Sequence, residues 1–287
     1  MTVEEEGKMT GRKRENSTAR VMILAGLLLF AAFIAVPLLW MLTASFRTPM
    51  EAFKWPPRIF PTTFDLRSYQ IVFEKVDIGQ FLFNSIKVSV LGTLLQVVAS
   101  AMAAYAFARF RFKGSRVLFI LYLSAMMIPG QVLSIPRFIV MSKLKLINSH
   151  AALILPMLFS AMGVFLIRQF MLTIPRSYDE AATIDGASRF YCFLHIIVPM
   201  TKPAIMVIAV QTFIASWNDF YGPLIYINSE SKMTLPLGLT ALRGMLNSGN
   251  ESALIASVLL TLTAPLLFYV FGQRYLVEGI NLGGLKG

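Results

Sequence analysis

The sequence has few charged residues and almost none of the side chains that disulfides and metal sites require. Of its 287 residues, 14% are charged and 56% are apolar, whereas a soluble domain is usually about a quarter charged. Cys192 is the only cysteine, which excludes an internal disulfide and a zinc site built from several thiolates. The two histidines, His150 and His195, cannot form an HExxH pair. The composition therefore excludes a soluble domain and these metal sites.

Catalytic motifs are absent as well. The sequence contains no GxxxxGK[ST] loop, so the chain does not hydrolyse ATP in the P-loop manner. Carboxylates cluster only at Asp179, Glu180 and Asp185, in a segment for which another role is argued below. We therefore expect a chain that is not an enzyme and that holds no cofactor and no metal.

Long apolar runs dominate what is present. Six of them, each of roughly 20 residues or more, are long enough to cross about 30 Å of hydrocarbon. We expect helices, because an unpaired backbone group in lipid costs several kcal/mol. The predicted spans are 21–46, 81–108, 117–141, 151–171, 203–217 (starting about a turn earlier) and 252–272. The fold class predicted is an all-α membrane protein with six transmembrane helices.

Basic residues between the spans indicate the orientation, because cytoplasmic loops are enriched in Lys and Arg. The stretches expected inside hold 15 of the 26 basic residues, and the loop 109–116 has four of them and no acid. This topology accounts for the net charge of +11 without nucleic acid. The predicted parts are a cytoplasmic tail 1–20, a first helix 21–46, an extracytoplasmic loop 47–80, a five-helix core 81–274 and a cytoplasmic tail 275–287. Within the second tail, we expect Arg274 and Lys286 at the headgroups.

The third span leaves two interpretations open. Pro129 and Gly130 interrupt it, and Gln131, Ser134 and Arg137 follow. These residues indicate either a broken helix that lines an aqueous path or a span whose end enters the headgroup region. The sequence favours the second.

The longest inner loop, 174–199, predicts a compact helix–turn–helix. Ser177 and Glu180 have the spacing of a capping box, in which each side chain satisfies the other's backbone amide. Gly186 suits a turn with left-handed backbone angles. Ser188 can cap a second, amphipathic helix that ends at Pro199. From the residues alone, this segment is either a docking surface for a cytoplasmic partner or an interfacial helix that seals the bundle.

The same segment resembles a known motif. Glu180-Ala181-Ala182, followed by Gly186 and Pro199, is similar to the EAA motif of permease subunits of bacterial binding-protein-dependent ABC importers. The wider string looks like the carbohydrate branch, close to the maltose-type second permease. Supporting matches are Ala103–Arg109, Met126–Pro129, Ala152–Pro156, Trp217–Phe220 and Thr234–Gly238, and the resemblance covers about residues 20–287.

The resemblance implies a type I ABC importer permease fold in the bacterial cytoplasmic membrane, with residues 178–189 as a coupling helix. It implies docking on an ATP-binding subunit by Glu180, Ala181, Ala182, Asp185 and Gly186. The implied partners are a second homologous permease, two subunits that bind ATP and Mg, an extracytoplasmic solute-binding protein and a carbohydrate. The implied function is ATP-coupled alternating access. A cavity lined by polar and aromatic groups of spans three to five would hold the sugar.

The outer end of the fifth span is a second candidate site. For Trp217, Asn218 and Asp219 two interpretations remain, an interfacial anchor and a contact with the binding protein or outer gate; for Trp217 we favour the anchor. The alternative function is a secondary carrier or channel for a small polar solute. Against it, acidic side chains are essentially absent from the middle of the spans.

Overall fold

The computed structural model describes residues 3–48, 64–245 and 250–283, and within these ranges it contains helices and no strand. The all-α fold class is therefore confirmed. The longer helices are α1 (Val3–Ser45), α2 (Arg67–Lys75), α3 (Ile78–Arg109), α4 (Ser115–Ser124), α5 (Ser134–Lys143), α7 (Ala161–Thr173), α8 (Ser177–Ile184), α11 (Lys202–Trp217), α13 (Leu235–Met245) and α14 (Glu251–Gly283). The shorter ones are η1 (Ala125–Met127), α6 (Ala151–Ile154), η2 (Leu155–Leu158), α9 (Arg189–Cys192), η3 (Phe193–Ile197), α10 (Val198–Met200), α12 (Tyr221–Tyr226) and η4 (Glu230–Lys232).

Most of the predicted spans correspond to helices. Four stretches are long and apolar enough to cross a membrane, namely Ala19–Ser45, Ile78–Arg109, Ala151–Thr173 and Glu251–Val270. The pair Arg189–Met200 and Lys202–Trp217, bent by 77°, makes a fifth if it counts as one span. Among the described residues, the number of such spans is therefore four or five, and the remaining expected span is not continuous.

That remaining span, 117–141, is broken. Helix α4 and the 3-10 turn η1 end at Met127, and Ile128 is extended, with φ −90° and ψ 116°. Pro129 explains the break, because a proline disfavours the helical conformation of the residue before it and has no N–H to donate. The chain is helical again only from Ser134, in α5. The structure therefore contains a broken helix at the position where we favoured a span end that enters the headgroup region.

Both chain ends contain more helix than expected. Helix α1 begins at Val3, so most of the predicted tail 1–20, whose sequence has no apolar periodicity, is helical. The absence of apolar periodicity indicates only that a segment has no packed face, and it does not prevent helix formation. Helix α14 similarly continues to Gly283, into the expected tail 275–287. The side chain of Arg274 and the whole of Lys286 lie outside the described residues.

The chain divides into two compact units. The first contains residues 1–72 and 247–259. In it, Ala44 and Ile255 are buried together, against Trp40 and Leu259. The Ser252 hydroxyl donates a hydrogen bond of 3.0 Å to the Thr48 carbonyl, which joins the two segments.

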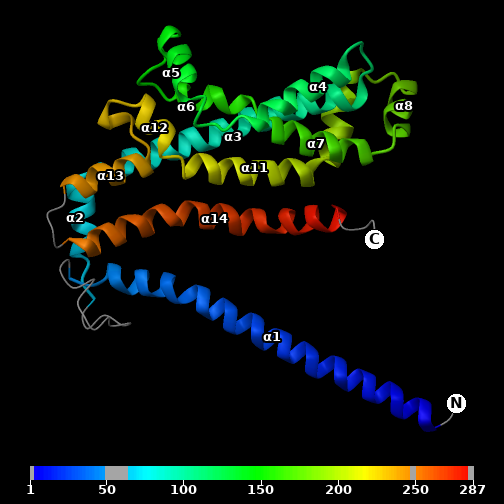
Figure 1. Cartoon of the computed structure of the whole chain (residues 1–287), viewed down its shortest axis with the longest axis horizontal. Helices are drawn as coiled ribbons and strands as arrows, with labels where there is room; N and C mark the ends of the chain where they lie inside the picture. Colours follow the sequence, from blue (N-terminus) through cyan, green and yellow to red (C-terminus); the bar gives the residue numbers. More distant parts are fainter. Residues whose placement is uncertain (1–2, 49–63, 246–249, 284–287) are drawn as a thin grey trace. The chain divides into compact units, whose positions relative to one another are not determined.

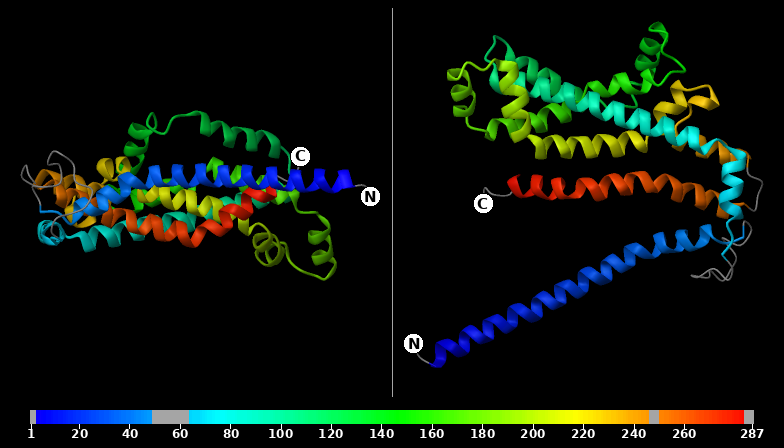
Figure 2. Two further views of the ribbon diagram at one scale, coloured as in Figure 1. Left: turned by 90° about the horizontal axis from the view of Figure 1, so that it is seen from below. Right: turned by 180° about the vertical axis from the view of Figure 1, so that it is seen from behind.

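The second unit contains residues 73–246 and 260–287. Helices α3, α7 and α11 lie side by side in it (Figure 1), and α3 packs against both of the others. Small residues permit this close approach. A Cβ on Gly163 of α7 would lie 2.7 Å from the Ser100 hydroxyl oxygen of α3, too close for any larger residue without a shift. Helix α8 lies at one end of this unit, and α12 lies at the opposite end (Figures 1 and 2).

Candidate functional site

The segment expected as an inner loop forms a protruding tip, made of α8, its turn and α9, which we call the α8–α9 tip (Figure 1). Its turn is a Schellman motif: the Gly186 N–H donates to the Thr183 carbonyl at 3.1 Å, and the Ala187 N–H donates to the Ala182 carbonyl at 2.9 Å. Gly186 has φ +80°, which favours glycine over residues with a Cβ. The predicted left-handed turn is therefore confirmed.

The second half of the tip also begins as predicted. The Ser188 hydroxyl oxygen accepts a hydrogen bond of 3.1 Å from the Tyr191 N–H, so Ser188 caps α9. Beyond α9, the chain makes one π-helical stretch, Phe193–Ile197, in which the Val198 N–H donates to the Phe193 carbonyl. Pro199 follows and supplies no donor of its own, and a π-bulge next to a missing donor is a common local adjustment.

The predicted capping box is wrong. Helix α8 already includes Ser177 as its first residue, and its N-cap is Arg176, which makes no side-chain cap hydrogen bond. The Arg176 carbonyl accepts from the Glu180 N–H at 3.0 Å, and the Pro175 carbonyl accepts from the Tyr178 N–H. The helix therefore starts one residue earlier than the Ser/Glu spacing indicates, and a helical Ser177 is not placed to cap it.

The acidic residues of α8 face different surroundings. Asp179 forms an ion pair with Arg109, the last residue of α3, with 3.0 Å between carboxylate oxygen and guanidinium Nε. The Arg109 side chain is 4% exposed and that of Asp179 18%. A second guanidinium nitrogen of Arg109 donates to the Ile174 carbonyl at 3.1 Å. By contrast, Glu180 and Asp185 are exposed. Sequence reasoning missed this pair, because it treated Arg109 only as part of a basic loop.

Most of the residues expected to dock do lie on the surface of the α8–α9 tip. Exposed members of the set are Glu180, Ala181, Asp185 and Gly186. Ala182 is 7% exposed, and its carbonyl closes the turn, so its side chain faces inward. Two apolar side chains, Tyr178 and Ile184, are exposed on the same helix, Ile184 to 86%. The tip therefore presents a carboxylate beside apolar surface.

The cluster at the end of α11 is not one surface. Trp217 is 1% exposed, and its indole N–H donates to the Thr261 carbonyl of α14 at 3.1 Å. Its ring also stacks on Phe213. The interpretation of Trp217 as an interfacial anchor is therefore wrong, because its N–H is satisfied inside the second unit. Asn218 and Asp219 are exposed, and Asp219 accepts from the Gly222 N–H at 3.1 Å.

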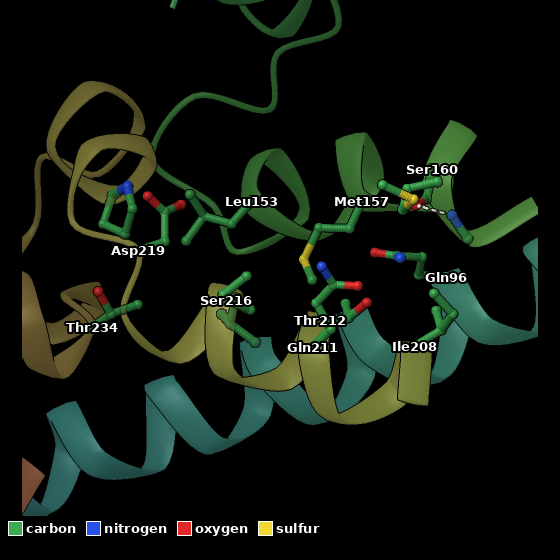
Figure 3. Close-up of a pocket in the computed structure, with 15 residues that line it drawn as sticks. Gln96, Leu153, Met157, Ser160, Ile208, Gln211, Thr212, Ser216, Asp219 and Thr234 are labelled. Atoms are coloured by element: carbon green, nitrogen blue, oxygen red, sulfur yellow. Dashed lines mark hydrogen bonds between the residues drawn. The ribbon is translucent and has the colours of Figure 1, made fainter. Parts of the chain in front are cut away.

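A cavity of about 400 Å³ lies between α3, η2, α7 and α11 (Figure 3). Its polar lining consists of Gln96, Ser160, Gln211, Thr212, Ser216, Asp219 and Thr234. Neither an aromatic residue nor any residue of the third expected span lines it. This cavity thus contains α3 beside the expected fourth and fifth spans, and the position of the sugar among spans three to five stays a prediction.

The broken third span lines a second cavity, of about 490 Å³, which shares Asp219 with the first. Gln131, Ser134 and Arg137 come from the break and from α5, and Tyr226 comes from α12. Burial, and to a lesser degree the Asp219 charge, raises the pKa of Tyr226, so its hydroxyl is neutral near neutral pH. Both cavities therefore offer amide and hydroxyl groups, with Asp219 where they meet.

Metal binding has no support in the part of the chain that the structure describes. Within it, no three His, Cys, Asp or Glu side chains lie close enough to hold an ion. Cys192 is buried in the tip.

Comparison with known proteins finds similar chains among transport components. Residues 96–281 match the family described as binding-protein-dependent transport system inner membrane component. The arabinooligosaccharides transport system permease protein AraQ of Halalkalibacterium halodurans is 34% identical over 279 residues, 96% of this chain and 100% of the relative. The lactose transport system permease protein LacG of Rhizobium radiobacter is 30% identical over 257 residues, 89% of this chain and 93% of the relative.

Solved structures share the fold. A chain of a bacterial ABC transporter involved in the import of the acidic polysaccharide alginate superposes with a TM-score of 0.80 and 21% identity, over 92% of this chain and 98% of that one. A chain of a bacterial alginate ABC transporter, in complex with an alginate pentasaccharide-bound periplasmic protein, has a TM-score of 0.60 and 12% identity, over 91% and 94%. At these identities, the likeness concerns the fold alone.

Proposed function

The chain belongs to the family of binding-protein-dependent transport system inner membrane components, and from this premise we propose that it carries a carbohydrate through the membrane. The names of its relatives support this cargo, since one serves arabinooligosaccharides and another lactose. The first cavity supports it as well, because its amides and hydroxyls can exchange hydrogen bonds with sugar hydroxyls.

We further propose that the chain performs no covalent chemistry and that separate subunits bind ATP with Mg and hydrolyse it. The complete importer would contain a second homologous permease, two ATP-binding subunits and an extracytoplasmic solute-binding protein. Closure of the ATP-binding subunits would favour one state of an alternating-access cycle, since a partner shifts an equilibrium by binding its two states unequally. The cargo would pass the cavities that meet at Asp219.

The α8–α9 tip is the proposed docking site, and its exposed surface is the observation that carries this proposal. Glu180 is exposed, while the neighbouring Asp179 is turned inward to Arg109. A carboxylate on a rigid, exposed helix can pair with a basic residue of a partner. The surrounding Tyr178 and Ile184 supply apolar contact area.

The proposed topology follows from the positions of the two candidate surfaces. Within the second unit, the α8–α9 tip and the end of α11 lie at opposite ends of the bundle (Figure 1). With the tip and both chain termini in the cytoplasm, Asn218 and Asp219 lie on the extracytoplasmic side. There they would contact the binding protein or form part of the outer gate.

Glu180→Arg tests the docking site. We expect the variant to insert into the membrane and to lose ATP-driven uptake. An arginine at position 180 would repel the basic residue of the ATP-binding subunit that is proposed to pair with Glu180. Uptake of radiolabelled oligosaccharide into cells measures this, with the membrane level of the protein determined by immunoblot. Glu74→Arg, at another exposed helical glutamate, is the matched control and should transport normally. Undiminished uptake by Glu180→Arg would contradict docking at this residue.

Co-purification separates the proposal from the alternative of a secondary carrier or channel. We expect an ATP-binding subunit to purify with the chain in a fixed ratio and uptake to require ATP. Uptake that follows an ion gradient, with no ATPase bound, would favour the alternative.

A further inference from the structure

The α8–α9 tip is tied to α3 at two points. Arg109, at the end of α3, pairs with Asp179 at 3.0 Å and donates to the Ile174 carbonyl at 3.1 Å. Tyr105, one helical turn earlier, donates its hydroxyl to the Arg189 carbonyl at 3.2 Å. One connection therefore holds α8 and the end of α7, and the other holds the first residue of α9.

The α3 partner of each connection is buried. The Arg109 side chain is 4% exposed, and Tyr105 also belongs to the core of the unit, where its ring packs on Phe193. Salt and water weaken a buried ion pair far less than an exposed one. When one partner of such a pair is removed, the other charge stays buried and unpaired. The tip therefore cannot move away from α3 without a large loss of interaction.

Three routes lead from the tip to the first cavity, and α3 is the stiffest of them. It runs without proline or a break from Ile78 to Arg109, and Gln96 of the cavity lies on it, about 20 Å from Arg109 at 1.5 Å per residue. The route through α7 is interrupted before α8 by Ile174, which is extended, and by Pro175. The route through α9 to α11 passes the π-helical stretch Phe193–Ile197 and a bend of 77°. A displacement of the tip therefore passes more directly into α3.

We propose that Arg109 and Tyr105 are positioning residues that transmit movement of the α8–α9 tip to α3, and thereby to Gln96 in the cavity. This inference rests on the proposed function, because the partner that moves the tip is the ATP-binding subunit. Neither residue lines the first or the second cavity. Their role is to make α3 follow the tip.

The test compares solute taken up with ATP hydrolysed. The complete importer is reconstituted in liposomes with solute-loaded binding protein, and both quantities are measured in the same sample. For Arg109→Gln, we expect uptake per ATP to fall about tenfold, in the range seen when coupling between sites is broken. The ATP-binding subunits should still co-purify in the wild-type ratio. A merely structural role would lower both activities together.

Two further variants test the pair itself. In the double variant Arg109→Gln with Asp179→Asn, we expect no more loss than in Arg109→Gln alone, because both residues act through one contact. Arg109→Lys keeps the charge but offers one nitrogen in place of the forked guanidinium, so it should restore part of the coupling.

Arg168→Gln is the matched control. Arg168 also joins helices of this bundle, since its Nε donates to the Phe107 carbonyl at 3.3 Å and its guanidinium lies 4.3 Å from the Phe119 ring centre. These contacts are with α3 and α4 and not with the tip. Uptake per ATP in this variant should stay within about twofold of wild type.

Several results would overturn the inference. The first is wild-type uptake per ATP in Arg109→Gln, and the second is an equal loss in Arg168→Gln. The third is loss of the ATP-binding subunits from Arg109→Gln alone, because the ion pair would then belong to the docking site itself. If Arg109→Gln does not accumulate in the membrane, Tyr105→Phe takes its place in the test, because it removes only the hydroxyl. Wild-type uptake per ATP in Tyr105→Phe would also overturn the inference. If wild-type protein binds no ATPase, the proposed function fails first.

Discussion

Gly186→Ala isolates the contribution of the tip's shape from that of its charges. Gly186 has φ +80°, and a Cβ added there would meet no atom within 4 Å. The substitution therefore introduces no clash, and its whole effect is the strain of an L-residue in the left-handed region, about 1–2 kcal/mol. That strain lowers the ratio of formed to unformed turn by a factor of about 5–30.

Uptake assays in cells should show this loss as reduced transport at a normal level of inserted protein. Gly186→Asn should transport better than Gly186→Ala, because asparagine tolerates left-handed backbone angles. This order of the two variants distinguishes backbone strain from a need for the small side chain itself, since asparagine is larger than alanine.

Gly114 supplies a matched control. It has φ +81° and also has open space where a Cβ would stand, but it precedes α4 and lies outside the tip. Gly114→Ala should therefore carry the same strain and leave uptake near wild type. Equal loss in the two alanine variants, or wild-type uptake in Gly186→Ala, would refute the reasoning.

Two more predictions concern stability. Trp217→Phe keeps an aromatic ring beside Phe213 but removes the hydrogen bond to the Thr261 carbonyl. We expect the free energy of unfolding to fall by about 1 kcal/mol, which lowers the melting temperature in detergent. Melting at the wild-type temperature would contradict the contact. Burial raises the pKa of Tyr226 in the folded protein above its ordinary value near 10. The neutral hydroxyl therefore contributes its full stability below about pH 10, and this contribution is lost as pH rises through the raised pKa. The difference in the free energy of unfolding between wild type and Tyr226→Phe should thus be constant from about pH 6 to 9. Above about pH 10, wild type should lose stability relative to the variant. A difference that changes near neutral pH would contradict this prediction.

Features that depend on nearby residues could be predicted from the sequence. The apolar run 81–108 gave helix α3 to within three residues at each end, because a long apolar run in lipid has no alternative to helix. Gly186 and Ser188 were placed correctly, since a turn and a cap involve residues only a few positions apart. The α8–α9 tip was therefore predictable in outline.

Contacts between distant segments could not be predicted in the same way. Arg109 and Asp179 are 70 positions apart in the sequence. The residues next to each of them do not indicate that the end of α3 contacts α8. Trp217 likewise satisfies its indole on α14, which a local pattern cannot reveal. Only packing determines which of several possible partners a polar side chain meets.

One overlooked signal was present in the sequence of α3. Buried polar residues recur on this apolar helix every three or four positions, at Ser85, Ser89, Thr93, Gln96 and Ser100. Residues at this spacing share one helix face. A polar stripe on an otherwise apolar span marks the face turned toward protein or cavity, and it would have indicated that α3 contributes to a cavity lining.

The packing of α8 against α3 determines which acid faces outward. Successive residues of an α-helix are separated by about 100°, so Asp179 and Glu180 cannot point the same way. Asp179 meets Arg109 at the end of α3, and Glu180 is exposed. The orientation of α8 on α3 therefore matters to the proposed docking as much as the presence of the two acids.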